Sequence, residues 1–295
     1  MFKNARTAAR GPLKLLLALG LAAWLPACGT SPIDEQAIPD LSDRPLAGKF
    51  VWHDLITDDV KAARRFYGRL LGWEFEEARH PRGGAYTLIK ANGRYIGGMV
   101  VRPDGGQADF SRWLPYLSVS DVDRSVSLTN AAGGETLVEP VALASIGRAA
   151  AVTDPQGAVL GLLRIRKGDP EDEREEHFGQ VLWDELVTSD PAAAVAFYQS
   201  LAGYQAETLA RNGGEYVVLE AQGHQRAGVL RRPNDDIQPQ WLTHFAVTDV
   251  ETAARRAADL GGQVLLAPSP DIRSGGFAIL SDPTGAVLAL TEYTP

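Results

Sequence analysis

Hydrophobic and polar residues follow a repeated order that predicts a strand, an amphipathic helix and then further strands. Residues 50–57 (FVWHDLIT) read as a short strand, and Asp58 or Asp59 supplies an N-cap for the helix behind it. Apolar residues then recur every fourth position until Gly72, which ends the helix. Three strands separated by glycine-containing turns are expected at 73–77, 85–91 and 95–101. The pattern therefore predicts a β-α-β-β-β module.

The same order of elements recurs directly afterwards. A strand at 116–120 precedes Asp121 as a cap, a helix over 122–132 and a Gly133-Gly134 stop. Strands at 135–140, 149–154 and 158–165 complete the second module.

The whole pair of modules is then repeated. Trp52–Gly72 and Trp183–Gly203 are identical at ten of 21 positions without a gap, and later matches include Asp154-Pro155 with Asp282-Pro283. The acid-rich stretch 167–178 between the copies is typical of a solvated linker. We therefore predict an α+β protein with four βαβββ modules in two tandem domains, at 49–166 and 179–295.

The N-terminus predicts export rather than a folded element. A basic region precedes eleven apolar residues, Leu15–Leu25, which are too few for a membrane-spanning helix of about 20 residues. Leu25-Pro26-Ala27-Cys28 resembles a bacterial lipobox, so residues 1–27 would be a signal peptide and Cys28 the lipidated residue. Gly29 implies, by the same resemblance, a protein anchored in the outer membrane and facing the periplasm. Residues 28–48 read as an extended tether.

Composition narrows the function further. The 295 residues include 29 basic and 37 acidic ones, a net charge of −8, and four of the basic residues lie in the first 14 positions. So acidic a body repels phosphate backbones, and we therefore expect no nucleic-acid partner. The single cysteine excludes an intrachain disulfide and a cysteine-based zinc site. The sequence leaves the oligomeric state open.

The repeated phrases WHDLITDDVKAARRFYGRLLGW, WDELVTSDPAAAVAFYQSLAGY, DPQGAVLGLL and DPTGAVLAL resemble the vicinal oxygen chelate (VOC) superfamily of glyoxalases, bleomycin-resistance proteins and extradiol dioxygenases. That resemblance implies a metal held by four His, Gln or Glu residues in a trough of each domain. The corresponding positions here carry residues that do not bind a divalent ion: Trp52, Leu114, Gly161 and a position near Gly98 in the first copy, and Trp183, Leu242, Ala289 and a position near Gly228 in the second. We therefore expect no metal and no cofactor.

The alternation of side chains along strands predicts which residues line the troughs. The candidate ligand-binding residues are Trp52, Asp54 and Tyr116 in the first copy and Trp183, Glu185 and His244 in the second. Glu185 and His244 are the candidate acid–base pair if the protein is an enzyme. A purely structural hydrogen bond between them is the alternative interpretation.

Three hypotheses follow. The first is an envelope-anchored, metal-free protein that binds a small organic ligand in one or both troughs. The second is a metal-dependent lyase or dioxygenase with a displaced site around Glu185 and His244. The third is a structural or interaction module.

Overall fold

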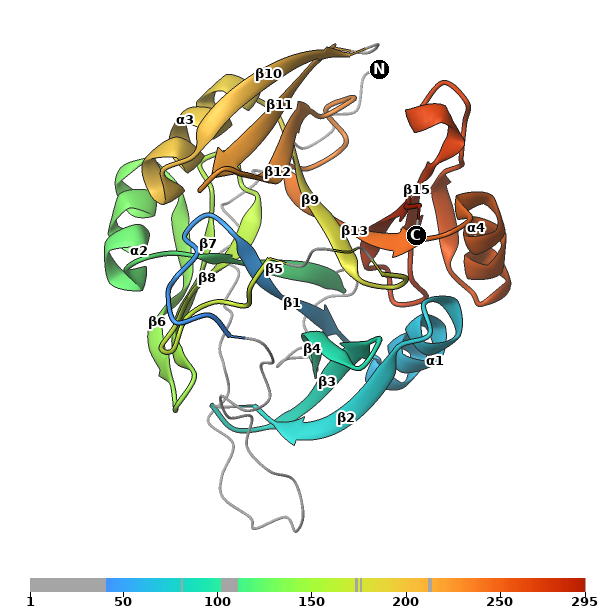
Figure 1. Cartoon of the computed structure of the whole chain (residues 1–295), viewed down its shortest axis with the longest axis horizontal. Helices are drawn as coiled ribbons and strands as arrows, with labels where there is room; N and C mark the ends of the chain where they lie inside the picture. Colours follow the sequence, from blue (N-terminus) through green and yellow to red (C-terminus); the bar gives the residue numbers. More distant parts are fainter. Residues whose placement is uncertain are drawn as a thin grey trace, which may run out of the picture.

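The computed structural model describes residues 41–80, 82–101, 111–172, 175, 177–211 and 214–294. They form two eight-stranded sheets, and each sheet belongs to a domain that also contains two helices (Figure 1). The elements of the first domain are β1 (Phe50–Thr57), α1 (Val60–Leu70), β2 (Glu74–Arg79), β3 (Ala85–Ala91), β4 (Arg94–Val101), β5 (Arg112–Ser118), α2 (Val122–Ala131), β6 (Glu135–Leu143), β7 (Gly147–Thr153) and β8 (Val159–Ile165).

The second domain repeats this order. Its elements are β9 (Val181–Thr188), α3 (Pro191–Ala202), β10 (Gln205–Arg211), β11 (Gly214–Ala221), β12 (His224–Arg231), β13 (Gln240–Val247), α4 (Val250–Asp259), β14 (Gln263–Leu266), a short 3-10 turn (Arg273–Gly275), β15 (Phe277–Ser281) and β16 (Val287–Glu292). The strand orders are β2-β3-β4-β1-β5-β8-β7-β6 and β10-β11-β12-β9-β13-β16-β15-β14. The predicted α+β fold of four βαβββ modules is thereby confirmed.

Each helix begins at the aspartate that its sequence supplies. The side chains of Asp59, Asp121, Asp190 and Asp249 accept a hydrogen bond from the backbone N–H three residues ahead. Gly203 caps α3 at a φ of 72°, in the left-handed region that favours glycine. The four cap aspartates therefore fix where each helix starts.

One predicted strand differs in its position. The expected strand at 116–120 is β5, which begins at Arg112 and ends at Ser118. Trp113 and Leu114 pair with Leu55 and Asp54 of β1, and both Trp113 and Leu114 are buried. The strand starts earlier than the sequence predicts because residues 112–114 also pair with β1.

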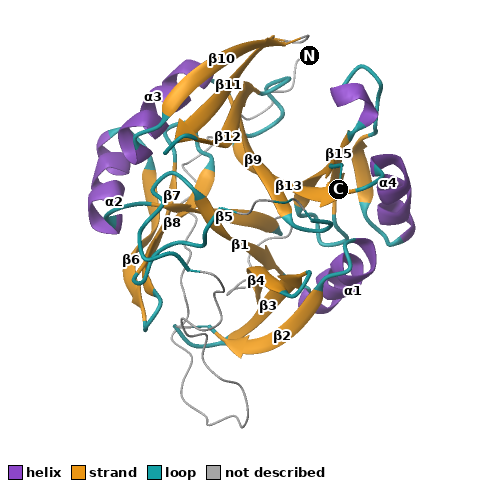
Figure 2. Ribbon diagram, in the orientation of Figure 1, coloured by secondary structure: helices purple, strands orange, loops and turns teal. Residues whose placement is uncertain are grey.

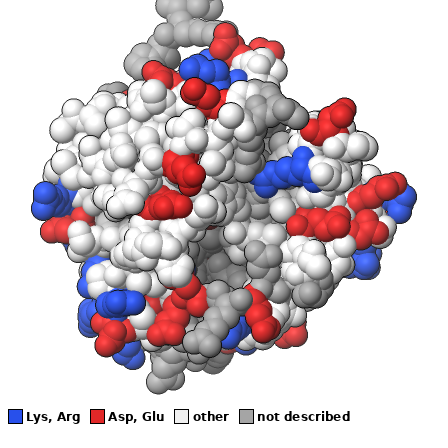
Figure 3. Space-filling model, turned by 45° about the horizontal axis from the view of Figure 1, so that its top comes forward, with Lys and Arg blue, Asp and Glu red and all other residues white. Residues whose placement is uncertain are grey.

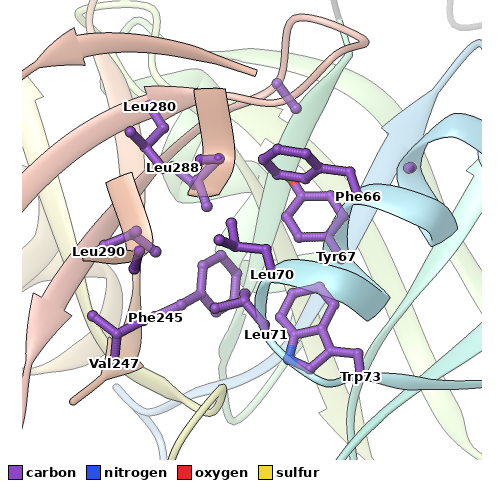
Figure 4. Packing of buried hydrophobic residues seen from close by; sticks show 14 of the residues in the cluster. Phe66, Tyr67, Leu70, Leu71, Trp73, Phe245, Val247, Leu280, Leu288 and Leu290 are labelled. Carbon is purple, nitrogen blue, oxygen red and sulfur yellow. The ribbon is translucent and has the colours of Figure 1, made fainter. Parts of the chain in front are cut away.

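The helices lie in two pairs, and each pair joins the two domains (Figure 2). Helix α1 shares a hydrophobic core with β13, α4 and β16, whereas α2 shares one with α3 and β9. Figure 4 shows the first of these cores, in which Phe66, Tyr67 and Trp73 face Phe245 and Leu288. The two domains thus bury their helix-bearing faces against each other and leave the concave face of each sheet on the other side.

A buried polar contact lies within this interface. His53 Nε2 is 2.9 Å from Asp184 Oδ2, and Thr243 Oγ1 donates to Asp184 Oδ1 at 2.8 Å. His53 and Asp184 occupy equivalent positions of the two copies, and both are at most 4% exposed. His53 is therefore a buried residue of the interface between the two domains.

The end of the expected tether pairs with the start of the expected linker. Ser42 N–H donates to Asp169 O, and Leu46 N–H and the Ser118 hydroxyl each donate to Asp169 Oδ2 at 2.5 Å. Asp169 is fully buried. Gly168 and Asp169 are consequently buried against the first domain, which corrects the expectation of a solvated linker for these two residues.

Candidate functional site

We call the concave faces of the β1–β8 and β9–β16 sheets trough one and trough two. Trough one brings together the three residues predicted for it. Asp54 Oδ1 accepts hydrogen bonds from the Tyr86 hydroxyl at 2.5 Å and from Trp52 Nε1 at 3.0 Å, and Oδ2 accepts one from the Tyr116 hydroxyl at 3.1 Å. Asp54 is 5% exposed. Its carboxyl group is therefore held by three neutral donors on the floor of the trough.

Burial governs the protonation of this group. It raises the pKa of Asp54, although the hydrogen bond from Tyr86 and the nearby His80 oppose the rise. Burial likewise lowers the pKa of His80, whose ring lies 5.4 Å from that of Tyr86. His80 thus borders trough one, whereas its polar sequence context suggests a loop residue without a chemical role.

Trough two gathers charged donors around the equivalent carboxylate. Glu185 Oε1 accepts from the Tyr216 hydroxyl at 2.8 Å and from Arg273 Nη2 at 2.9 Å. The Tyr216 hydroxyl also accepts a hydrogen bond from Trp183 Nε1 at 2.9 Å. The predicted residues Trp183 and Glu185 are therefore linked through Tyr216.

His244 completes this group. Its Nε2 lies 3.6 Å from Glu185 Oε2, an ion-pair distance that is too long for a hydrogen bond, and its Nδ1 is 2.9 Å from Thr291 Oγ1. His244 is fully buried, and Nε2 has no hydrogen-bond partner among the described residues. The structure thus places Glu185 and His244 on the same face, as predicted from strand alternation.

The pKa of Glu185 is shifted in the opposite direction from that of Asp54. Burial acts to raise the pKa of Glu185, but His244, Arg273 and Tyr216 together outweigh it and lower the pKa below the ordinary value. Trough two therefore holds an ionised carboxylate beside a guanidinium and an imidazole.

The strand register tests whether either trough fits the four metal ligands of the fold. Gly98 is level with Asp54, and Gly161 is level with Tyr116. Leu114 shares the row of Asp54 and Gly98, and Trp52 shares the row of Tyr116 and Gly161, so the positions counted from the sequence lie in these same two rows. In trough two, Gly228 is level with Glu185 and Ala289 with His244.

Tyrosine rings fill the space above the glycines. A Cβ on Gly98 would lie 2.0 Å from the Tyr86 ring, one on Gly161 would lie 2.2 Å from Tyr116, and one on Gly228 would lie 1.9 Å from the Tyr216 hydroxyl oxygen. Among the described residues, no group of three or more His, Cys, Asp or Glu side chains could hold a metal ion. The residues present do not fit a four-ligand metal centre, and we derive no step through one.

Some residues of the site carry little signal in the sequence. Tyr86 and Tyr216 lie on middle strands, where core packing explains a tyrosine equally well. Arg273 lies in the segment between β14 and β15. The sequence of this segment has no periodicity that would indicate a contact between Arg273 and Glu185. Thr291 is recognisable only once β16 is placed beside β13.

Comparisons with known proteins agree with this fold. Residues 49–162 match the model of the Glyoxalase/Bleomycin resistance protein/Dioxygenase superfamily, and residues 180–291 match that of a Glyoxalase-like domain. CFP32 of Mycobacterium tuberculosis, whose name marks it as a candidate glyoxylase, is 32% identical over 247 residues, covering 83% of this chain and 94% of that protein. The anthracycline biosynthesis protein DnrV of Streptomyces peucetius is 31% identical over 263 residues, covering 83% and 93%.

Solved structures share the fold at low identity. The Mn(II)-bound glyoxalase from Novosphingobium aromaticivorans superposes with a TM-score of 0.54 at 20% identity, covering 84% of this chain and 82% of that one. The 2,2',3-trihydroxybiphenyl 1,2-dioxygenase from Sphingomonas wittichii superposes with a TM-score of 0.56 at 15% identity, covering 85% and 91%. With its two tandem glyoxalase-like domains, the chain belongs to the glyoxalase/bleomycin resistance protein/dioxygenase superfamily.

Proposed function

We propose that the protein binds a small organic molecule without a metal, and that trough two is the principal site. The observation that carries this proposal is the buried Nε2 of His244, which has no hydrogen-bond partner among the described residues and lies 3.6 Å from an ionised Glu185. An unsatisfied buried polar atom is costly to a fold, so its persistence favours a partner that the chain does not itself supply.

The walls of trough two suit an apolar body. Leu242 and Phe277 are buried, and Leu266, Ile272 and Ile279 are half-buried around them. The ring of His244 lies 5.4 Å from that of Phe277. Two relatives are named for anthracycline biosynthesis, which supports an aromatic ligand as the first class to test.

Two measurements test this proposal. Native mass spectrometry of protein purified from its own envelope should reveal a bound organic mass that Glu185→Gln or His244→Ala diminishes. Elemental analysis of protein purified without chelators should find far less than one Zn, Ni, Fe or Mn per chain. Stoichiometric metal that survives dialysis would instead favour a displaced lyase or dioxygenase site at Glu185 and His244. Absence of any bound or titratable small molecule would favour an interaction module.

We also propose that the protein is a lipoprotein of the bacterial envelope, anchored in the outer membrane and facing the periplasm. Cys28, the proposed lipidated residue, lies outside the described residues. The described helices include none that is long and apolar enough to cross a membrane. Cys28→Ala should leave an uncleaved, non-acylated precursor, and normal processing of that variant would contradict the proposal.

A nucleic acid is not among the binding partners that we propose. The net charge is −8, and on the face drawn in Figure 3 acidic and basic side chains are interspersed among uncharged ones. Phosphate backbones are bound by concentrated positive charge. A small molecule and, through the lipid, a membrane are the partners we propose.

A further inference from the structure

Arg273 stands between the floor and the mouth of trough two. Its guanidinium lies 2.9 Å from Glu185 Oε1 and 5.1 Å from the centre of the Phe277 ring. The Arg273 side chain is 31% exposed, whereas those of Glu185 and His244 are 6% and 0% exposed. A ligand that enters from solvent therefore meets Arg273 before it reaches either floor residue.

The backbone holds Arg273 in an unusual conformation. Arg273 and Ser274 have φ angles of 47° and 54°, in the left-handed region that residues other than glycine seldom adopt. Such backbone conformations persist where the surrounding structure enforces them, and they gather at functional sites. The ion pair with Glu185 and the contact with Phe277 supply that enforcement here.

The guanidinium keeps donors for a further partner. Arginine carries five N–H donors in a planar fork, and only Nη2 of Arg273 makes a hydrogen bond that the described residues account for. A fork with free donors fits a carboxylate in bidentate geometry. The Nε2 atom of His244, which has no hydrogen-bond partner among the described residues, offers a second polar contact.

Trough one lacks this arrangement. The 128-residue spacing of the repeat places Ser145 where Arg273 stands, and the donors around Asp54 are two phenols and an indole. In the described part of the chain, Glu185 is therefore the only one of the two trough carboxylates with a guanidinium hydrogen-bonded to it.

We infer that Arg273 is the recognition residue of trough two and that the ligand is an aromatic or apolar carboxylic acid, with Glu185 as the residue that positions Arg273. The inference rests on the proposed function and adds to it the chemical class of the ligand.

Three naphthalene probes of similar size test this inference by isothermal titration calorimetry on the full mature chain. 2-Naphthoate carries a carboxylate, 2-naphthamide is its neutral counterpart, and 2-naphthylmethylammonium carries the opposite charge. We expect 2-naphthoate to bind at least tenfold more tightly than 2-naphthamide. Arg273→Gln should remove that preference while changing the affinity for 2-naphthamide less than twofold.

Arg166→Gln is the matched control, because Arg166 is an exposed arginine that bonds the Ala144 carbonyl in the equivalent loop of the first domain. This variant should keep the preference for 2-naphthoate, and unchanged thermal melting should show that both variants fold. Equal affinity of the wild type for 2-naphthoate and 2-naphthamide would overturn the inference and leave the proposed function standing. Tightest binding of the ammonium probe would also overturn it, since Arg273 would then occupy the place of a cationic ligand. If no probe binds, the proposed function fails and the inference fails with it.

Discussion

The two troughs carry a carboxylate at the same position of the repeat, yet they hold it in opposite ways. Asp54 is surrounded by neutral donors, and burial raises its pKa. Glu185 has an arginine and a histidine beside it, and its pKa is lowered. One extra methylene and two replaced neighbours therefore separate a carboxyl group held by neutral donors from one held beside an arginine and a histidine.

The position before each carboxylate, His53 in the first copy and Asp184 in the second, also differs between the two copies. His53 and Asp184 are equivalent in the repeat, but they point away from the troughs and pair with each other between the domains. Two identical domains would place like residues at this point. Duplication within one chain allowed the two copies to become complementary at the interface and dissimilar in the troughs.

The largest effect that we expect concerns this interface. His53→Asp would oppose two buried carboxylates and should lower the free energy of unfolding by roughly 3–5 kcal/mol, as for a broken buried pair. The exchange variant His53→Asp/Asp184→His should recover part of the loss. Recovery should be incomplete, because Thr243 donates to Asp184 whereas position 53 faces Pro115. Urea unfolding followed by tryptophan fluorescence measures both, and a single variant within 1 kcal/mol of wild type would contradict the assignment.

The next prediction compares the two carboxylates directly. At pH 7, Glu185→Gln should cost about 2 kcal/mol of unfolding free energy, since it removes the charged partner of Arg273. Asp54→Asn should cost less than about 1 kcal/mol, since an amide replaces a buried group with a raised pKa. Denaturation at pH 7 measures which variant loses more unfolding free energy. A larger loss for Asp54→Asn than for Glu185→Gln would show that trough one holds the charged network.

A smaller effect should appear in ligand binding. Glu185→Gln and His244→Ala should each weaken binding by an order of magnitude or more, roughly 1.4 kcal/mol, while Asp54→Asn and Tyr116→Phe should cost less. Calorimetric titrations at pH 7 measure these affinities, and they would contradict the assignment if the trough-one variants were the more damaging.

The smallest effects should be opposite pH dependences of stability. The raised pKa of Asp54 means that its contribution is present below the ordinary value of 3.8 and is lost as the pH rises through the folded value. The lowered pKa of Glu185 means that its contribution is present above 4.5 and is lost as the pH falls. Between pH 3 and pH 7, Asp54→Asn should therefore gain stability relative to wild type, and Glu185→Gln should lose it. Melting temperatures of the two variants and the wild type measured over one pH series test this prediction. They would change in parallel with pH if the pKa of neither group were shifted.

The sequence predicts the modules well because the signals are local and occur four times. Aspartate caps, glycine stops and strand alternation each depend on a few adjacent residues, so Trp52 and Asp54 could be assigned to one face. Glu185 and His244 could be assigned together because they belong to strands of known direction.

Other features depend on how distant segments meet. Arg273 reaches Glu185 from a segment without periodicity, and a distance of 88 residues separates the two in the chain. The contact of His53 with Asp184 depends on the docking of the domains, which no local pattern describes. The alignment of Gly98 with Asp54 and of Gly161 with Tyr116 likewise depends on the stagger between strands, which counting along one strand does not give.

The sharing of cores between domains also constrains the order in which the chain can fold. Helix α1 completes its core only with residues of the last module, and the Thr57 hydroxyl donates to that of Thr284, 227 residues further on. Contacts of such high sequence separation must overcome a large loop-closure entropy and form slowly. A nascent chain would therefore carry its first module with an open apolar surface until the last strands leave the ribosome. The N-terminal module is made first, but its hydrophobic core is completed only when the last module has been made.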